Sequence, residues 1–299
     1  MSGLRFRHAL IIGVGLIGGS LARAMRRAGL VERISGVGRS KENLERARCL
    51  GIIDARHESL AEAFRHEEFD LIVVAVPMGE YDRVFGDLAR YAEDGMLITD
   101  VGSTKRHAIE VAEKHLGSLE CFVPAHPIAG TERSGAAASF AELFDHRWCI
   151  LTPLASTKPQ ALQQIEQLWA ACGARVVCMD AGLHDELLAG VSHLPHLAAY
   201  ALVNAVRRST PAHCEHDPFA FAAGGFRDFT RIASSSPEMW RDIVLANADA
   251  LVPKIDALQR ELSELSAAIK ARDGRLLLER FSAAKAARDG WLTRYGGDL

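Results

Sequence analysis

The chain has 299 residues, a formal net charge of −3, 48% hydrophobic residues and 24% charged residues. This length predicts about two domains, and this composition is typical of a globular protein. The weak net charge favours neither nucleic acid nor an acidic membrane surface as a partner, and no stretch reaches the roughly 20 apolar residues that cross a bilayer. The N-terminal segment lacks the cleavage-site pattern of a signal peptide, so we expect a cytoplasmic protein.

The cysteines indicate free thiols in a reducing compartment. Six of them are scattered along the chain, and none belongs to a C-x-x-C pair. Residues 213–216 read His-Cys-Glu-His, but these side chains are too crowded for the usual spacing of zinc ligands. We therefore interpret this segment as a polar loop and expect no metal site.

The first 180 residues alternate short apolar runs with stretches of helical spacing. Such short, almost continuous runs suit strands that are buried on both faces of a parallel sheet. The runs are Ala9–Val14, Ile34–Val37, Leu71–Val76, Met96–Val101, Cys121–Ala125, Trp148–Leu151 and Arg175–Met179. Between them, Ser20–Ala28, Lys41–Leu50 and Lys158–Cys172 have helical spacing. The alternation predicts an α/β fold, with a doubly wound parallel sheet of the Rossmann type over residues 1–181.

The pattern changes after Asp180, and we expect a second, all-helical domain over residues 182–299. Residues 183–208 are predicted to form one helix that Pro195 kinks, because proline lacks the N–H of the helical ladder. Residues 209–236 are rich in Pro, Gly, Ser and Phe and are predicted to be loop and short turns. From Pro237 onward the spacing is helical again.

Two apolar stripes follow in the C-terminal helices. The first recurs at steps of three and four residues, through Ile255, Leu258, Leu262, Leu265 and Ile269, and the second nearly continues it, through Leu278, Phe281, Arg288, Trp291 and Tyr295. Such stripes bury against other helices, either within the chain or in a second copy of it. The two arrangements can coexist, and we expect a homodimer.

A glycine-rich segment, residues 13–18, stands between the first predicted strand and the first predicted helix. It reads G-x-G-x-x-G, and this strand-to-helix position is the one that a dinucleotide-binding motif requires. The glycines permit a tight turn, and the helix N-terminus offers free N–H groups to the pyrophosphate. The residues expected at the cofactor are Gly13, Gly15, Leu16, Ile17 and Gly18, joined by Val76, Pro77 and Ser103.

The end of the second predicted strand bears on the choice of cofactor. An enzyme that uses NAD usually has an acidic residue there, which bonds the ribose 2′-hydroxyl. Here Gly38 takes that place, and Arg39, Ser40 and Lys41 follow, where a 2′-phosphate would lie. Arginine can hold a phosphate through two hydrogen bonds. The sequence therefore predicts a preference for NADP over NAD, with a solvated basic turn as the alternative.

Two predicted strands end in segments rich in polar side chains. Residues 100–105 read Asp-Val-Gly-Ser-Thr-Lys, and residues 125–132 begin with Ala-His-Pro. Ligands of open α/β sheets bind at the carboxyl ends of the strands. Because His126 follows such a strand and is held by Pro127, it is a candidate acid–base catalyst, and we expect Ser103 to lie beside it.

The second domain contains further polar segments. They are His184-Asp185-Glu186, Ser192–His196, and a run from Gly224 to Trp240 that carries Arg227 and Arg231. Arginines in a loop between apolar helices suggest an anionic substrate, although a single such arginine is more often a surface cation.

Five segments together resemble the prephenate/arogenate dehydrogenase family. They are GVGLIGGSLA, DVGSTK, HPIAGTERSG, SHLPH and GGFRDFTRIASSSPEMW, which stand in the family's order between residues 13 and 240. The resemblance implies a Rossmann domain followed by a helical dimerisation domain. It implies a cyclohexadienyl substrate, prephenate or arogenate, which loses hydride to NAD or NADP and loses carbon dioxide as the ring becomes aromatic.

The resemblance also implies roles for individual residues. His126 would draw the proton from the ring hydroxyl, and Ser103 would hold the hydroxyl and His126 in register. Arg231 would bind a substrate carboxylate, paired with Glu132 as a gate, and Asp228 would reach a neighbouring subunit's site. The remaining residues expected to line the pocket are Thr131, His193, His196 and Trp240.

The sequence leaves two questions open and is compatible with two rival functions. The missing acidic residue puts NAD in doubt, and nothing decides between prephenate and arogenate. With no room for an appended regulatory domain, tyrosine would inhibit at the active site. A β-hydroxyacid dehydrogenase would place a catalytic lysine in the first helix after the nucleotide domain, but residues 183–208 contain none. A non-catalytic NADP sensor need not keep His126, Ser103 and Arg231 together.

Overall fold

The computed structural model describes residues 4–93, 95–131, 133–209, 211 and 216–296. By its internal contacts the chain divides into two compact units, residues 1–248 and residues 249–299. This division by contacts differs from the domain boundary expected between residues 181 and 182, which stays a prediction.

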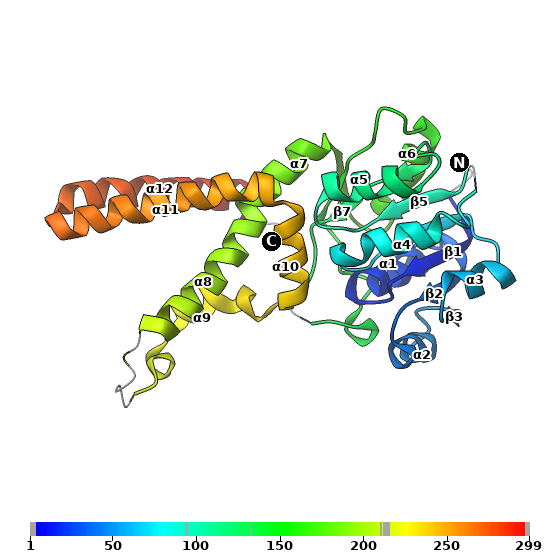
Figure 1. Cartoon of the computed structure of the whole chain (residues 1–299), viewed down its shortest axis with the longest axis horizontal. Coiled ribbons are helices and arrows are strands. Elements are labelled where there is room, and N and C mark those ends of the chain that lie inside the picture. The colour runs from blue at the N-terminus through cyan, green and yellow to red at the C-terminus, as the bar shows by residue number, and fades with distance from the viewer. Residues whose placement is uncertain (1–3, 94, 132, 210, 212–215, 297–299) are drawn as a thin grey trace. The chain divides into compact units, whose positions relative to one another are not determined.

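The first unit is built on a six-stranded parallel sheet in the order β3-β2-β1-β4-β5-β6 (Figure 1). The strands are β1 (Phe6–Ile12), β2 (Val31–Val37), β3 (Ala55–His57), β4 (Leu71–Val74), β5 (Leu97–Asp100) and β6 (Phe122–Val123). This order is that of the doubly wound nucleotide-binding fold, whose ligands bind where the strand order reverses, beside β1 and β4. The fold class predicted from the sequence is confirmed.

Helices cover both faces of this sheet, and each face has its own core. Because successive side chains of a strand point to opposite faces, Ala9 and Ile11 of β1 join one core whereas Leu10 and Ile12 join the other. The helices are α1 (Leu16–Arg27), α2 (Lys41–Cys49), α3 (Leu60–His66), α4 (Tyr81–Leu88), α5 (Lys105–His115) and α6 (Pro159–Ala171). Burial on both faces explains the continuously apolar strands.

The apolar run expected to form one strand over residues 121–125 is instead divided between two sheets. Phe122 and Val123 form β6, whereas β7 (Ala125–Pro127) belongs to a second sheet of the order β7-β8-β9. In that sheet β7 is antiparallel to β8 (Trp148–Leu151), and β8 is parallel to β9 (Arg175–Cys178). Pro124 separates the two strands. As a result, His126 lies within a short strand and not beyond the end of one.

A long interrupted helix follows the second sheet. It consists of α7 (Ala181–Leu188), a π-helical turn (Ala189–His193) and α8 (Leu194–Ser209). The change of hydrogen-bonding register falls directly before Pro195, which has no N–H to donate; the kink expected at this proline stays a prediction. The loop expected over residues 209–236 is wrong at α9 (Gly224–Thr230), and α10 (Pro237–Ala246) completes the unit, capped by the Ser236 hydroxyl.

The second unit is a helical hairpin of α11 (Ala248–Ala271) and α12 (Gly274–Tyr295). Ion pairs from Arg280 to Glu261 and Glu264 join the two helices. The predicted stripe is poorly covered within the chain, since Leu262 is 58% exposed and Ile269 is 61% exposed. No residue of α12 is buried. Among the described residues, no helix is long and apolar enough to traverse a membrane.

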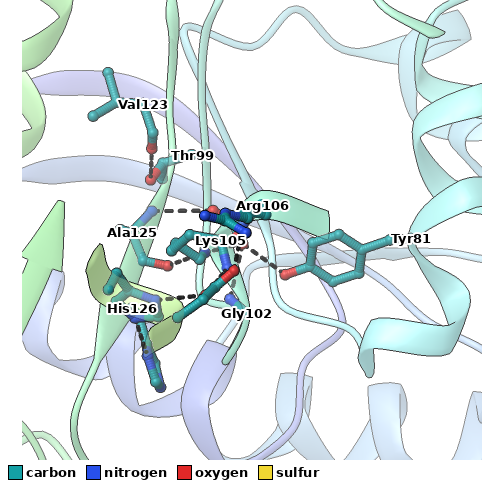
Figure 2. Close-up of polar contacts among 11 residues, drawn as sticks. Tyr81, Thr99, Gly102, Lys105, Arg106, Val123, Ala125 and His126 are labelled. Atoms are coloured by element: carbon teal, nitrogen blue, oxygen red, sulfur yellow. Dashed lines mark hydrogen bonds and ion pairs between the residues drawn. The ribbon is translucent and has the colours of Figure 1, made fainter. Parts of the chain in front are cut away.

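A buried ion pair connects β5, α5 and β7. The Lys105 ammonium is fully buried and donates to Asp100 Oδ2 and to the carbonyl of Ala125, both at 2.6 Å. Asp100 also accepts hydrogen bonds from the amides of Ala125 and Gly102 and from the Tyr81 hydroxyl, at 2.8–3.0 Å (Figure 2). A buried charge that is paired and fully hydrogen-bonded is tolerated, whereas an unpaired one is costly.

Replacing Lys105 with methionine should therefore lower the free energy of unfolding by about 3–5 kcal/mol, because Asp100 would stay buried without its cation. Urea unfolding followed by circular dichroism measures the change. The matched control is Lys114→Met, which removes an exposed ion pair with Asp82 and should cost less than about 1 kcal/mol. Equal losses in the two variants would show that the buried pair contributes no special stability.

Candidate active site

The glycine-rich turn has the geometry that close approach of a dinucleotide requires. Gly13 has φ of +99°, and a Cβ there would lie 2.3 Å from the Ala75 carbonyl oxygen. A Cβ on Gly18 would lie 2.3 Å from the Gly13 oxygen. Gly15 precedes the first turn of α1, and a Cβ there would meet no atom within 4 Å. Two of the glycines thus permit the turn, and the third leaves the approach to the helix N-terminus open.

A cavity of about 350 Å³ opens beside this turn. Six of the eleven residues expected at the cofactor line it, namely Gly13, Gly15, Arg39, Ser40, Val76 and Pro77, whereas Leu16, Ile17, Gly18, Lys41 and Ser103 are not in its wall. The residues present fit a dinucleotide, because the cavity lies at the carboxyl ends of β1, β2 and β4, where such ligands bind.

The basic residues after β2 already have acidic partners. Arg39 Nη1 lies 2.9 Å from Glu80 Oε1, and Lys41 Nζ lies 2.7 Å from Glu58 Oε1. The hydrogen bond from Lys41 holds the pKa of Glu58 below its ordinary value. Both carboxylates line the cavity. No local sequence pattern predicts this pairing, because Glu58 and Glu80 come from segments distant from Arg39 and Lys41.

His126 is the end of a chain of three buried side chains. Its Nδ1 lies 2.8 Å from His184 Nε2, and His184 Nδ1 lies 2.8 Å from Asp185 Oδ1. Asp185 also accepts hydrogen bonds from the backbone amides of Lys105 and Arg106, at 2.8 and 2.9 Å. The chain of contacts therefore runs from the start of α5 through α7 to β7.

A further buried histidine, His193, is held by Asn247. The Asn247 amide nitrogen lies 3.0 Å from His193 Nδ1 and donates to the Asp185 carbonyl oxygen at 2.9 Å. Among the described residues, His193 Nε2 and the indole nitrogen of Trp240 are buried without a hydrogen-bond partner. Trp240 stacks on His196 with ring centroids 3.6 Å apart. Two buried donors or acceptors are thus available to a ligand at this place.

Burial keeps these imidazoles neutral. Burial lowers the pKa of His126 well below its ordinary value, and the nearby His184, Lys105 and His193 lower it further. Burial likewise lowers the pKa of His193 to about 4. For Asp185, burial alone would raise the pKa, but hydrogen bonds from His184 and two amides outweigh it and keep the pKa low. A neutral imidazole beside a fixed carboxylate is the state in which histidine accepts a proton.

Not every residue predicted for the site is joined to this cluster. Ser103 lies in the loop after β5 and is half-buried, but no hydrogen bond links it to His126 among the described residues. Thr131, Asp228 and Arg231 are exposed. The Thr131 hydroxyl accepts from the Arg133 amide, and Asp228 pairs with Arg227. The expected pair of Glu132 with Arg231 lies outside the described residues, because Glu132 is not among them.

The sequence alone does not identify the residues that support the histidines. It shows His184 and Asp185 only as part of a polar segment, and it does not distinguish Asn247 and Lys105 from other polar residues. The adjacent His-Asp pair before a histidine-rich turn was a signal for the first two. Asn247 donates to a backbone carbonyl 62 residues away, a contact that no sequence pattern predicts.

Comparisons with known proteins match most of the length of the chain. Residues 21–178 match the model of the prephenate dehydrogenase nucleotide-binding domain, and residues 180–283 match that of the prephenate dehydrogenase dimerization domain. The chain is 39% identical over 288 residues to a cyclohexadienyl dehydrogenase of Zymomonas mobilis, covering 95% of both chains. It is 38% identical over 293 residues to a prephenate dehydrogenase of Bacillus subtilis, covering 97% of this chain and 77% of that one.

A solved structure is similar as well. The prephenate dehydrogenase of Aquifex aeolicus, in complex with hydroxyphenyl propionate and NAD⁺, superposes with a TM-score of 0.90 at 35% identity. The match covers 96% of this chain and 99% of that one.

The glycine-rich turn yields a test of both stability and binding. Gly13→Ala should lower the free energy of unfolding by at least about 1–2 kcal/mol, because its φ is left-handed and its Cβ meets backbone. Gly15→Ala is the matched control, since its Cβ has space; stability should change by less than about 0.5 kcal/mol. Both variants should weaken dinucleotide binding in a fluorescence titration. A stable Gly13→Ala protein that binds normally would contradict the geometry described for the turn.

Proposed function

Because the chain belongs to the prephenate dehydrogenase family, we propose that it catalyses the oxidative decarboxylation of prephenate, arogenate or both in tyrosine biosynthesis. Prephenate would give 4-hydroxyphenylpyruvate and arogenate would give tyrosine, each with release of carbon dioxide. The observation that carries the proposal is His126, whose ring is anchored through Nδ1. Lys105 links its strand β7 to Asp100 at the carboxyl end of β5, in the sheet that carries the dinucleotide turn.

The reaction requires three things of the protein: an acceptor for hydride, a base for the ring hydroxyl and a clamp for an anionic substrate. A nicotinamide cofactor, NAD or NADP, supplies the hydride acceptor when bound. The hydroxyl proton passes to a base as the carbonyl forms. The bond to the ring carboxylate then breaks, its electron pair completes the aromatic ring, and carbon dioxide leaves. No second base is needed for that last step.

His126 is the proposed base. Its Nδ1 is occupied by His184, so Nε2 is the nitrogen left to face a substrate. Neutrality at ordinary pH keeps that nitrogen ready to accept a proton, and positioned proton transfer contributes about 10²–10⁴-fold in rate. We propose Ser103 as the residue that keeps the hydroxyl in register, because the loop that contains it is fixed by Asp100 through the Gly102 amide.

The remaining site residues are proposed to bind substrate. Arg231 would take a carboxylate, with Glu132 as its gate and Asp228 reaching the site of a second subunit. The others would line the pocket: Thr131, His193, His196 and Trp240. The buried nitrogens of His193 and Trp240, which have no partner in the part of the chain that the structure describes, support this assignment, since a ligand would satisfy them.

The cofactor preference depends on charges at the end of β2. Arg39 and Lys41 favour the 2′-phosphate of NADP, but Glu80 and Glu58 already engage them. The 2′-phosphate must displace these carboxylates, which reduces the free energy gained when it binds. We therefore expect both cofactors to be accepted, with only a modest preference for NADP.

We further propose the domain boundary near residue 181 and a homodimer formed through the second domain. The two matched family models meet at residues 178 and 180. Exposed apolar residues support the proposal that a second copy of the chain covers these surfaces. They include Leu183, Leu187 and Val191 of one helix face, and Leu262, Ile269, Leu278 and Phe281 of the hairpin. Contiguous exposed apolar residues mark interaction surfaces.

Initial rates with prephenate and arogenate, each with NAD and NADP, test the function. We expect turnover in at least one combination, loss of kcat by about 10²–10⁴-fold in His126→Gln, and competitive inhibition by tyrosine. Glu80→Gln should raise kcat/KM for NADP relative to NAD, because it frees Arg39. Glu68→Gln, an exposed change away from the cavity lining, is the control.

Absence of turnover in all four combinations, with a folded protein that binds NADP, would overturn the ring-substrate assignment. A hydroxyacid dehydrogenase or an NADP sensor would then be tested next. Strict use of NAD would refute the cofactor preference while leaving the reaction intact, and non-competitive inhibition would place tyrosine at another site.

The dimer is tested by sedimentation velocity. The unaltered chain should sediment as a dimer, and Phe281→Glu should shift it toward monomer, because a charge on an apolar interface is costly to bury. Glu279→Gln, an exposed polar change on the same helix, should leave the dimer unchanged. A monomeric unaltered chain would refute the proposal.

A further inference from the structure

The hydrogen atoms of the buried histidines can be placed from the chemistry of their partners. Asp185 accepts from two backbone amides and lies 2.8 Å from His184 Nδ1. These hydrogen bonds hold the pKa of Asp185 below its ordinary value, so the carboxylate is ionised and can only accept. His184 Nδ1 therefore carries a hydrogen.

The hydrogen position on His184 determines the one on His126. His184 is kept neutral by burial, so with a hydrogen on Nδ1 its Nε2 has a lone pair. That nitrogen lies 2.8 Å from His126 Nδ1, and a hydrogen bond between them requires the hydrogen on His126 Nδ1. His126 Nε2 is consequently bare, which is the form that accepts a proton.

His193 is held in the opposite tautomer. The Asp185 carbonyl oxygen can only accept, so the Asn247 atom that faces it at 2.9 Å is the amide nitrogen. The same nitrogen lies 3.0 Å from His193 Nδ1. His193 Nδ1 therefore accepts, and the hydrogen of its neutral ring is on Nε2, which is buried without a partner among the described residues.

We infer that Asp185 anchors opposite tautomers in the two histidines, so that His126 presents a bare nitrogen and His193 presents an N–H to the bound substrate. The side chain of Asp185 acts through His184, and its backbone carbonyl acts through Asn247. His184, Asp185 and Asn247 are thus positioning residues. A ligand oxygen that accepts from His193 and a hydroxyl that donates to His126 match this pair. The inference rests on the proposed function only for the role of His126 in turnover.

Nitrogen-15 NMR of histidine-labelled protein tests the tautomers directly and without turnover. At a pH where the rings are neutral, His126 should be protonated at Nδ1 and His193 at Nε2, with signals assigned by His126→Gln and His193→Gln. In His184→Leu the His126 preference should be lost while His193 keeps its own. Protonation of His126 at Nε2 in the unaltered protein would overturn the inference, whatever the substrate proves to be.

Kinetics test whether the tautomer matters. Asp185→Asn and His184→Leu should lower kcat by about 10²-fold or more, while KM for the ring substrate and the Kd of the dinucleotide change less than about threefold. His184→Gln should recover part of the rate, because its amide can donate to Asp185 and accept from His126. His66→Gln, an exposed change at the end of α3, is the control.

A merely structural role predicts a different pattern: parallel loss of stability, kcat and binding, with no recovery in His184→Gln. That pattern would overturn the positioning role. The groups that face His126 are His184 and Asp185 of α7, Lys105 of α5 and His193 of the π-helical turn, so the acid limb of kcat/KM should move in His184→Leu and stay in place in His66→Gln. If the substrate assignment fails, the NMR result still decides the tautomers.

Discussion

Lys105 is the residue on which the site depends, because it holds both ends of the histidine chain. Its ammonium bonds Asp100 and the Ala125 carbonyl, next to His126, and its backbone amide bonds Asp185, next to His184. Removing an ammonium from water costs several kcal/mol. Burial accordingly lowers the pKa of Lys105, whereas Asp100 opposes that shift. The cost is offset only while every one of these contacts is made, so the start of α5, β7 and α7 are fixed together.

The same burial determines the chemistry. A histidine in water is partly protonated near neutral pH and exchanges between two tautomers. In this site burial removes the charged form of His126, and a chain ending in an ionised carboxylate removes one tautomer. The stability of the fold depends on pH for the same reason. Because the pKa of His193 falls from 6.5 to about 4 on folding, the unfolded chain binds more protons between these values. The stability that neutral His193 contributes is present above pH 6.5 and is lost as the pH falls toward 4.

The sequence predicted those parts of the molecule that depend on neighbours along the chain. The glycine turn, the buried strands and the helix interrupted at Pro195 each follow from local spacing or local stereochemistry. The division of residues 121–127 between two sheets was not predictable, because it depends on which distant strand pairs with each half. The helix α9 was missed since its two leading glycines and its phenylalanines read as loop. The local sequence marks His126 as a candidate, whereas the support of His126 by His184 and Asp185, and of His193 by Asn247, depends on the fold.

The site combines a rigid interior with exposed polar side chains. His126, His184 and His193 are at most 9% exposed and have their orientations fixed by buried partners, whereas Thr131, Asp228 and Arg231 are exposed to solvent in the single chain. This distribution suits a reaction in which one proton moves over a short path and a charged substrate must enter from water. Long-range attraction needs exposed charge, and proton transfer needs geometry that does not relax when the charge moves.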